Sequence, residues 1–151
     1  MNKKEVKKFI WNFNAPLGWC IEMKYPPKKY GYLTKEEKQK IKERNKTIIA
    51  ASEHGGKTIY LNPDKFCIMS EDDLNNVLIH EIAHTATKGH SHCKIWFDEA
   101  VKLGWNIEKE YALQQRDNND IARKVGLVDF SKYVELLSKE CKCIESFEKV
   151  G

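Results

Sequence analysis

Residues 80–84 read HEIAH and fit the pattern H-E-x-x-H. On a helix, residues four apart lie one turn apart on the same face, so the imidazoles of His80 and His84 can reach one ion. Bound zinc lowers the pKa of a water molecule to about 7, and Glu81 beside it can take the proton as general base. The resulting hydroxide can attack a carbonyl group that the same ion polarises. The pattern therefore predicts a zinc hydrolase with His80 and His84 as metal ligands and Glu81 as the catalytic base.

A catalytic zinc site needs a third protein ligand, and two histidines shortly after the motif are candidates for it. His92 begins a stretch with helical apolar spacing, which includes Trp96 and Ala100. A ligand beside these packed residues would be held by the core instead of by a flexible loop. We therefore predict His92 as the third ligand and keep His90 as the alternative. Imidazole ligands without an evident redox ligand favour Zn²⁺ over iron or copper.

Two predicted helices position these residues. Ser70 and Asp73 form a capping box, and apolar residues recur after it at helical spacing, so we expect a helix over 71–87. A second helix is expected over 92–103, where Gly104 closes it. The first helix would present His80 and His84, and the second would present the third ligand.

Capping pairs, periodicity and turn residues predict the remaining elements. A turn with two glycines between apolar runs indicates a β-hairpin, and a short strand precedes it. The expected strands are 18–25, 46–52 and 57–61, and the expected further helices are 3–13, 34–45, 117–126 and 129–150. We therefore expect an α+β fold, in which the H-E-x-x-H helix packs on a small, mostly antiparallel sheet and the C-terminus is helical.

Length and composition limit the class of protein. With 151 residues the chain can bury one core, and we expect residues 1–151 to form a single domain. Hydrophobic residues make up 41% and aromatic residues 11%, which excludes a disordered chain. The 26 Lys and Arg residues exceed the 22 Asp and Glu residues only slightly, so the composition permits a nucleic-acid-binding surface without indicating one.

The cysteines and the hydropathy pattern bear on the compartment. The five cysteines are odd in number and irregularly spaced, unlike a secreted disulfide framework. No stretch approaches the roughly 18 apolar residues of a membrane span. We therefore expect a soluble protein of the cytoplasm or another intracellular compartment, without a membrane partner. Cys93 is expected to be a small buried residue on the side of Trp96.

Three sequence motifs occur along the chain, in the order TIYLNP, LNNVLIHEIAH and HCKIWFDEAVKLGW. Over roughly residues 45–105 they resemble the SprT-like zinc metallopeptidases and their relatives in the WLM group. In these families a third histidine begins the next helix and an aromatic residue follows four positions later, which His92 and Trp96 match. The resemblance implies a zincin-like fold, Zn²⁺ on His80, His84 and His92, and a protein or peptide substrate. Some members of this type cut proteins crosslinked to DNA, so the resemblance also implies DNA as a partner.

The same resemblance implies how a substrate is bound. Strand 57–61 would border the active-site cleft and present its edge to an extended peptide, which adds as a further strand. Tyr60 and Tyr111 are both candidates for stabilising the oxyanion. The chain departs from the SprT pattern in its short loop after the second histidine and in its last cysteines. Cys141 and Cys143 form a C-x-C pair instead of the four-ligand ribbon that SprT proteins often carry.

Two alternative functions follow from the same residues. His90 lies six residues after His84, a spacing shared by metzincins, WLM proteins and YbeY-like RNA-processing hydrolases. However, metzincins have glycine where Thr87 stands, and YbeY-like proteins have glycine in place of Glu81. The first alternative is a zinc hydrolase that acts on RNA or on a small amide. The second is a non-catalytic binding module stabilised by zinc, which the presence of Glu81 disfavours because a purely structural site is more often closed by a fourth ligand.

Overall fold

The structure is a computed structural model that describes residues 1–26, 33–117 and 129–142. Within these ranges it is an α+β protein with six α-helices and a three-stranded mixed sheet. The elements are α1 (Lys3–Asn12), β1 (Cys20–Glu22), α2 (Lys35–Asn45), β2 (Ala50–Glu53), β3 (Thr58–Leu61), a 3₁₀ turn (Phe66–Ile68), α3 (Glu71–Ala86), α4 (Lys94–Lys102), α5 (Ile107–Arg116) and α7 (Phe130–Ser138). The predicted helix 117–126 falls almost entirely outside the described residues.

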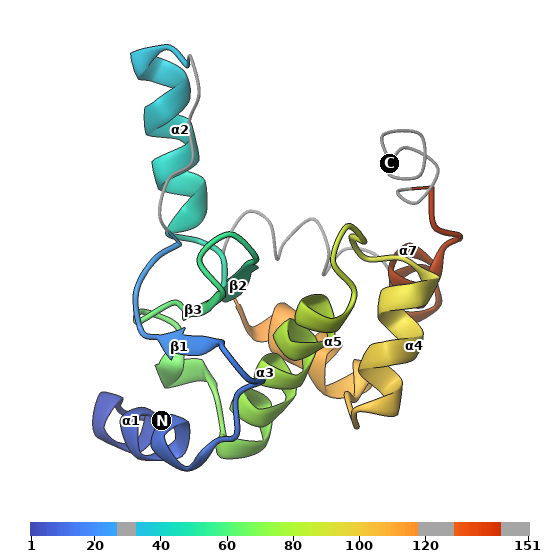
Figure 1. Cartoon of the computed structure of the whole chain (residues 1–151), viewed down its shortest axis with the longest axis horizontal. Coiled ribbons are helices and arrows are strands. Elements are labelled where there is room, and N and C mark those ends of the chain that lie inside the picture. The colour runs from blue at the N-terminus through green and yellow to red at the C-terminus, as the bar shows by residue number, and fades with distance from the viewer. Residues whose placement is uncertain (27–32, 118–128, 143–151) are drawn as a thin grey trace.

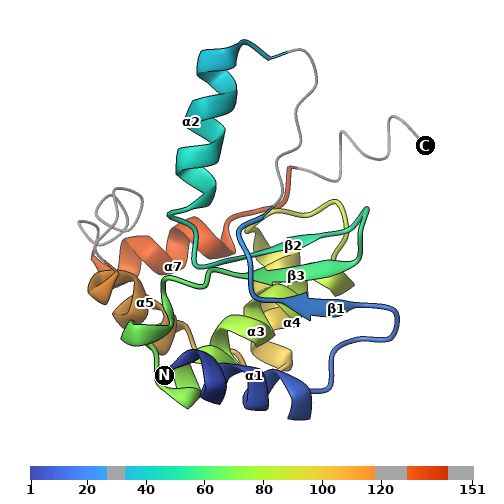
Figure 2. The ribbon, with the colours of Figure 1, turned by 90° about the vertical axis from the view of Figure 1, so that its left-hand side faces the viewer.

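Helix α3 is the central element, since it contacts β2 of the sheet as well as α4 and α5. Figure 2 shows the three strands side by side, with α1 and α3 on one side of them and α2 projecting on the other. Helix α7 contacts both α4 and α5. Helix α2 stands away from the other helices, and none of its residues is buried (Figure 1). The helix that carries H-E-x-x-H is therefore held by both the sheet and the other helices.

Strand β3 is the middle strand of the sheet, in the order β1-β3-β2. Strand β2 pairs with it antiparallel, with Ala50 opposite Leu61, so the predicted hairpin is confirmed. Strand β1 pairs with it in parallel, with Cys20 opposite Thr58. The expectation of a mostly antiparallel sheet is therefore wrong. The long connection 23–57 contains α2 and β2, and such a crossover lets the chain return beside β1 in the same direction.

The first strand of the hairpin begins at Ala50, later than the predicted residue 46. The side-chain amide of Asn62 donates hydrogen bonds to the carbonyls of Lys46 (2.7 Å) and Ile48 (2.8 Å). These carbonyls are therefore bonded to a side chain instead of to a neighbouring strand. The side-chain oxygen of Asn62 also accepts a hydrogen bond of 2.8 Å from the backbone amide of Asp64. Asn62 thus joins the end of β3 to the segment that leads into β2.

The capping box predicted at Ser70 is confirmed, and Asn2 and Thr34 form two further boxes at the starts of α1 and α2. In each box the side chain of the N-cap residue accepts a hydrogen bond from the third helical residue, which satisfies one of the free amide groups at the helix start. These local signals place α1, α2 and α3 within one residue of their predicted bounds.

Helix α4 begins at Lys94, so the predicted helix 92–103 starts later than expected. Cys93 is its N-cap and has an extended backbone, with φ −145° and ψ 179°. His92 consequently lies in the loop between α3 and α4, not in the first turn of the helix.

Helix α5 has no counterpart among the predicted elements. The predicted helix 129–150 is confirmed only for Phe130–Ser138, because the backbone of Lys139 is extended, with φ −63° and ψ 156°. The part of that prediction beyond residue 142 lies outside the described residues.

Buried apolar side chains form two clusters that meet along α3. The first lies between α1, the sheet and the first half of α3, and consists of Val6, Ile49, Ile59, Leu61, Phe66, Met69, Leu74, Val77, Leu78 and Leu113. The second lies between the second half of α3, α4 and α7, and consists of Ala83, Trp96, Ala100, Trp105, Tyr133 and Leu137. One domain over residues 1–151 stays a prediction. In the described ranges no helix is both long and apolar enough to cross a membrane.

Replacing Asn62 by alanine tests the hydrogen bonds that connect the end of β3 to the segment before β2. Asn62 is 1% exposed, and Asn62→Ala leaves two carbonyls and one amide without their partner. We expect the free energy of unfolding to fall by about 2–4 kcal/mol, measured by urea denaturation followed by circular dichroism. The exposed Asn12 is the matched control, and Asn12→Ala should stay within about 0.5 kcal/mol of wild type. Equal stability of the two variants would contradict this role of Asn62.

Candidate metal centre

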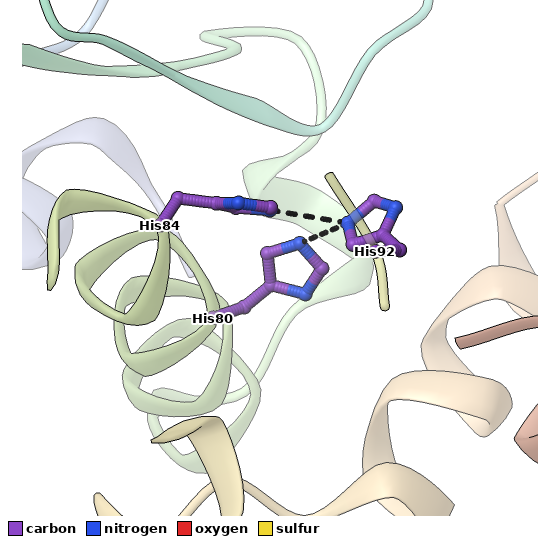
Figure 3. A group of neighbouring side chains, drawn as sticks. All are labelled: His80, His84 and His92. Atoms are coloured by element: carbon purple, nitrogen blue, oxygen red, sulfur yellow. Dashed lines mark hydrogen bonds between the residues drawn. The ribbon is translucent and has the colours of Figure 1, made fainter. Parts of the chain in front are cut away.

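Three imidazoles converge on one point between α3 and α4. Helix α3 supplies His80 and His84 one turn apart, and the loop before α4 supplies His92 (Figure 3). The Nε2 atom of His92 lies 3.1 Å from that of His84 and 3.0 Å from that of His80. Nitrogen ligands of a tetrahedral zinc ion lie about 2.0–2.1 Å from the metal and hence about 3.3 Å apart. The three nitrogens are therefore spaced as a set that could hold one metal ion.

His90, the alternative third ligand, is not part of this set. Its backbone amide bonds to the carbonyl of Thr87 at 3.0 Å, and Gly89 between them has a φ of +88°, so the chain turns sharply after α3. The ring nitrogen Nδ1 of His90 lies 3.7 Å from Sγ of Cys93. The structure thus brings His92, and not His90, to the two histidines of α3. Metal binding by these residues stays a prediction.

Cys93 is buried, as predicted, but it also forms a disulfide bond with Cys141. The start of α4 lies beside the segment after α7, where the amide of Lys94 donates to the carbonyl of Lys139 at 2.8 Å. This contact brings the two cysteines to a Cα–Cα distance of 5.1 Å, within the range of disulfides. This pairing was not predicted, because the two cysteines are 48 positions apart and no local pattern relates them.

Two of the three histidines are neutral at pH 7. Burial, together with the neighbouring histidines, lowers the pKa of His84 to about 2. Burial and the charge of His80 lower the pKa of His92 to about 4. Burial would also lower the pKa of His80, but the carboxylate of Glu110 outweighs it and raises that pKa. Because metals bind the neutral imidazole, the lowered pKa values of His84 and His92 favour the ligand form, whereas the raised pKa of His80 opposes it.

A buried carboxylate orients His80. The Nδ1 atom of His80 contacts a side-chain oxygen of Glu110, from α5, and the hydroxyl of Tyr133, from α7, donates to the other oxygen at 2.7 Å. Burial would raise the pKa of Glu110, but His80 and the hydrogen bond from Tyr133 lower it below its usual value. The contact at Nδ1 leaves Nε2 of His80 facing the other two histidines. Metal-binding histidines in proteins usually have such a partner at their second nitrogen.

Glu110 and Tyr133 are absent from the sequence predictions. Asn106, whose side chain caps α5, and the pair Ile107 and Tyr111, one turn apart and packed on the second cluster, could have indicated this helix. No local pattern, however, relates Glu110 to a histidine 30 residues earlier in the chain.

Glu81 lies beside the cluster with one oxygen unsatisfied. The side chain is buried, and Oε1 lies 3.9 Å from Nε2 of His80. Oε2 is buried and has no hydrogen-bond partner among the described residues. Burial and the nearby Glu110 raise the pKa of Glu81, and the charge of His80 and a hydrogen bond with Ser52 only partly offset this. A buried carboxylate oxygen without a partner is unfavourable, so this atom is suited to a ligand or a water molecule in the site.

The ring of Trp96 packs against the rings of all three histidines. It is fully buried, and its ring centroid lies 4.5 Å from that of His80, 5.2 Å from that of His84 and 4.7 Å from that of His92. Its indole nitrogen donates to the backbone carbonyl of His80 at 3.3 Å. The predicted anchoring of the third histidine next to Trp96 agrees with these contacts, although His92 itself lies in a loop.

Two hollows in the surface meet at the histidine cluster. One has a volume of about 340 Å³ and extends towards Glu110 and Tyr133, and the other has about 510 Å³ and extends past Ser52 and His84. Both are lined by Ile48, Ala50, His80, Glu81 and His92. No lysine or arginine is among the described residues that line either hollow.

The strand that borders these hollows is β2, not the predicted strand 57–61. Strand β3 is paired on both edges, with β1 and β2, so it has no edge to offer to a substrate. β2 is the outer strand on this side of the described sheet, and its residues Ala50 and Ser52 line the hollows. The predicted role of strand 57–61 is therefore wrong, because an edge role requires an unpaired side.

Neither tyrosine considered for oxyanion stabilisation lines the hollows. The hydroxyl of Tyr60 donates to Glu53 at 3.4 Å. Tyr111 packs its ring against Phe130 and Tyr133. Neither tyrosine is therefore among the described residues that line the site.

Replacing Trp96 by alanine tests its support of the centre. Trp96→Ala removes a fully buried side chain, and we expect the free energy of unfolding to fall by about 3–5 kcal/mol. Urea denaturation in the presence of a chelator, followed by circular dichroism, measures this without a contribution from metal. Trp11 is 88% exposed, so the control Trp11→Ala should change stability by no more than about 0.5 kcal/mol. A similar loss in both variants would contradict the role of Trp96.

Comparisons with known proteins do not assign the chain to a family. No protein-family model, curated protein or solved structure matches it significantly. The resemblance to SprT-like metallopeptidases therefore rests on the quoted motifs, and the geometry around His80 is the basis for proposing a function.

Proposed function

We propose that this chain is a zinc-dependent metallopeptidase that hydrolyses peptide bonds. The observation that carries the proposal is the unpartnered, buried Oε2 of Glu81 beside three converging imidazole nitrogens. Three histidines leave one position of a tetrahedral zinc ion open, whereas structural sites are closed by a fourth protein ligand. The donor set and the adjacent carboxylate thus fit a catalytic metal better than a structural one.

The residues of the metal centre would have different roles, as metal ligands or as residues that position a ligand. His80, His84 and His92 would bind Zn²⁺, with Glu110 and Tyr133 fixing the orientation of His80. When bound, zinc supplies Lewis-acid chemistry, polarising a carbonyl group and lowering the pKa of water.

Glu81 would accept the proton of the attacking water and deliver it to the nitrogen that leaves. Its raised pKa suits both steps, because a base with a pKa nearer to neutral can also return the proton.

The linings of the two hollows favour a peptide over a nucleic acid. Binding of RNA or DNA relies on Lys and Arg side chains that neutralise phosphates, and the described linings have none. The outer edge of β2 can instead pair with the backbone of an extended peptide and lead it past Glu81. A zincin-like fold and an association with DNA rest on the resemblance alone.

Replacing Glu81 by glutamine separates metal binding from catalysis. Glu81→Gln keeps the shape of the side chain and removes the base, so zinc content should stay unchanged while cleavage of denatured casein falls by about 10²–10⁴-fold. The control is Glu108→Gln, an exposed position of α5, which should retain both properties.

Three outcomes of this experiment would overturn the proposal. Wild-type protein without zinc would remove its basis, and equal cleavage by Glu81→Gln and wild type would exclude Glu81 as the base. Hydrolysis of an RNA oligonucleotide or a small amide, with no cleavage of peptides, would support the alternative hydrolase instead.

Replacing Glu110 tests the orientation of His80. Glu110→Gln keeps the size of the side chain but weakens the contact at Nδ1, so zinc affinity should fall by about 10–100-fold. Competition with a chromophoric chelator measures this, and Glu108→Gln again serves as the control. Wild-type affinity in Glu110→Gln would show that this contact does not support the metal.

A further inference from the structure

A second group of metal-binding atoms lies next to the first and is not used by the proposed function. The Nδ1 atom of His90 and the sulfurs of Cys93 and Cys141 all lie within 4.8 Å of one another. His90 and Cys93 come from the loop and the N-cap before α4, whereas Cys141 comes from the segment after α7. This group therefore joins two parts of the chain that are far apart in sequence.

The donor types are those of a zinc site. Thiolates and imidazoles are the ligands of structural zinc, and a ligand pair separated by two residues, as in His90 and Cys93, is typical of such sites. The three described ligands leave one position of a tetrahedral ion for water, so this second set is not closed by protein ligands alone. Cys143 follows Cys141 by two residues in the sequence, but it lies outside the described residues and the three described ligands carry the argument.

The position of His90 distinguishes a metal site from a disulfide alone. A disulfide between Cys93 and Cys141 requires only the two sulfurs, at a Cα–Cα distance that the structure provides. The ring nitrogen of His90, 3.7 Å from Sγ of Cys93, adds a third donor atom close enough to the two sulfurs to share one ion. Two sulfurs and one ring nitrogen around a common point make a metal-binding set.

We propose that His90, Cys93 and Cys141 bind a second zinc ion when the two cysteines are reduced. The ion clamps the loop that carries His92 to the segment after α7, because His92 lies between two of its ligands in the sequence. It therefore holds the third histidine of the first site in place without contacting it. The existence of this second site does not depend on the proposed peptidase activity.

The disulfide and the zinc complex are alternative states of the same cysteines. A phosphine reductant donates two electrons to the sulfur–sulfur bond and takes an oxygen atom from water, becoming a phosphine oxide. The two protons of that water are transferred to the two sulfurs, so Cys93 and Cys141 become thiols. Zinc binding then releases both thiol protons to solvent, since the thiolate is the ligand form.

Cobalt substitution of the reduced full-length chain tests the site directly. Co²⁺ bound to thiolates gives a sulfur-to-metal charge-transfer band in the near ultraviolet, which a set of three imidazoles does not give. We expect this band in wild type and about two zinc ions per chain by elemental analysis. Absence of the band, with both thiols reacting freely with an aromatic disulfide reagent in the presence of zinc, would overturn the proposal and leave a disulfide only.

Paired variants assign each ion to its ligands. The double variant Cys93→Ser, Cys141→Ser should lose the band and keep about one zinc ion, whereas Cys67→Ser, at an exposed free cysteine, should keep the band and about two ions. His90→Ala should weaken cobalt binding at the sulfurs. Loss of the band in Cys67→Ser, or its retention in the double variant, would contradict the assignment.

Variants of the first site separate this proposal from the peptidase. The double variant His80→Ala, His84→Ala should lose one zinc ion and casein cleavage but keep the cobalt–sulfur band. A wild-type chain that shows the band and binds only about one zinc ion would support the second site and overturn the first. Wild-type measurements alone decide whether the second site exists, so the test does not depend on the folding of any variant.

Discussion

The contact between Glu110 and His80 determines how the centre of this protein is built. A carboxylate that is taken out of water loses several kcal/mol of hydration, and only close partners can offset that loss. Here His80 contacts one oxygen and the hydroxyl of Tyr133 bonds to the other. Because Glu110 comes from α5 and its partner Tyr133 comes from α7, the histidine cluster has its observed orientation only when both helices are packed against the rest of the fold. The fold and the site thus depend on the same buried charge.

The residues that α3 contributes could be predicted because helix geometry alone places His80 and His84 on one face. The choice of His92 over His90 could be argued from the packing of Trp96, and the structure brings His92 to the cluster beside that ring. Its place in a loop was not predicted, since the extended backbone of Cys93 has no sequence signal. The role of Glu110 could not be predicted at all, because it depends on a tertiary contact between residues far apart in the chain.

The same division holds for the sheet. The hairpin of β2 and β3 is local, and its glycine-containing turn indicates it. The parallel partner β1 comes from a distant part of the chain, so the local sequence pattern of a strand could not predict that both edges of β3 are paired. The late start of β2 is also a tertiary effect, since Asn62 bonds to the carbonyls that a strand would otherwise use. The edge available to a substrate was therefore assigned to the wrong strand.

The spacing of the three histidines affects the entropy of assembling the site. Their closest contacts join residues only 8 and 12 positions apart, whereas the contact of Glu110 with His80 spans 30 positions and the pairing of Cys20 with Thr58 spans 38. The entropy lost on closing a loop grows with loop length, though slowly. Closing the loops between the histidines therefore costs less chain entropy than closing the loops between the helices and strands that hold them in position.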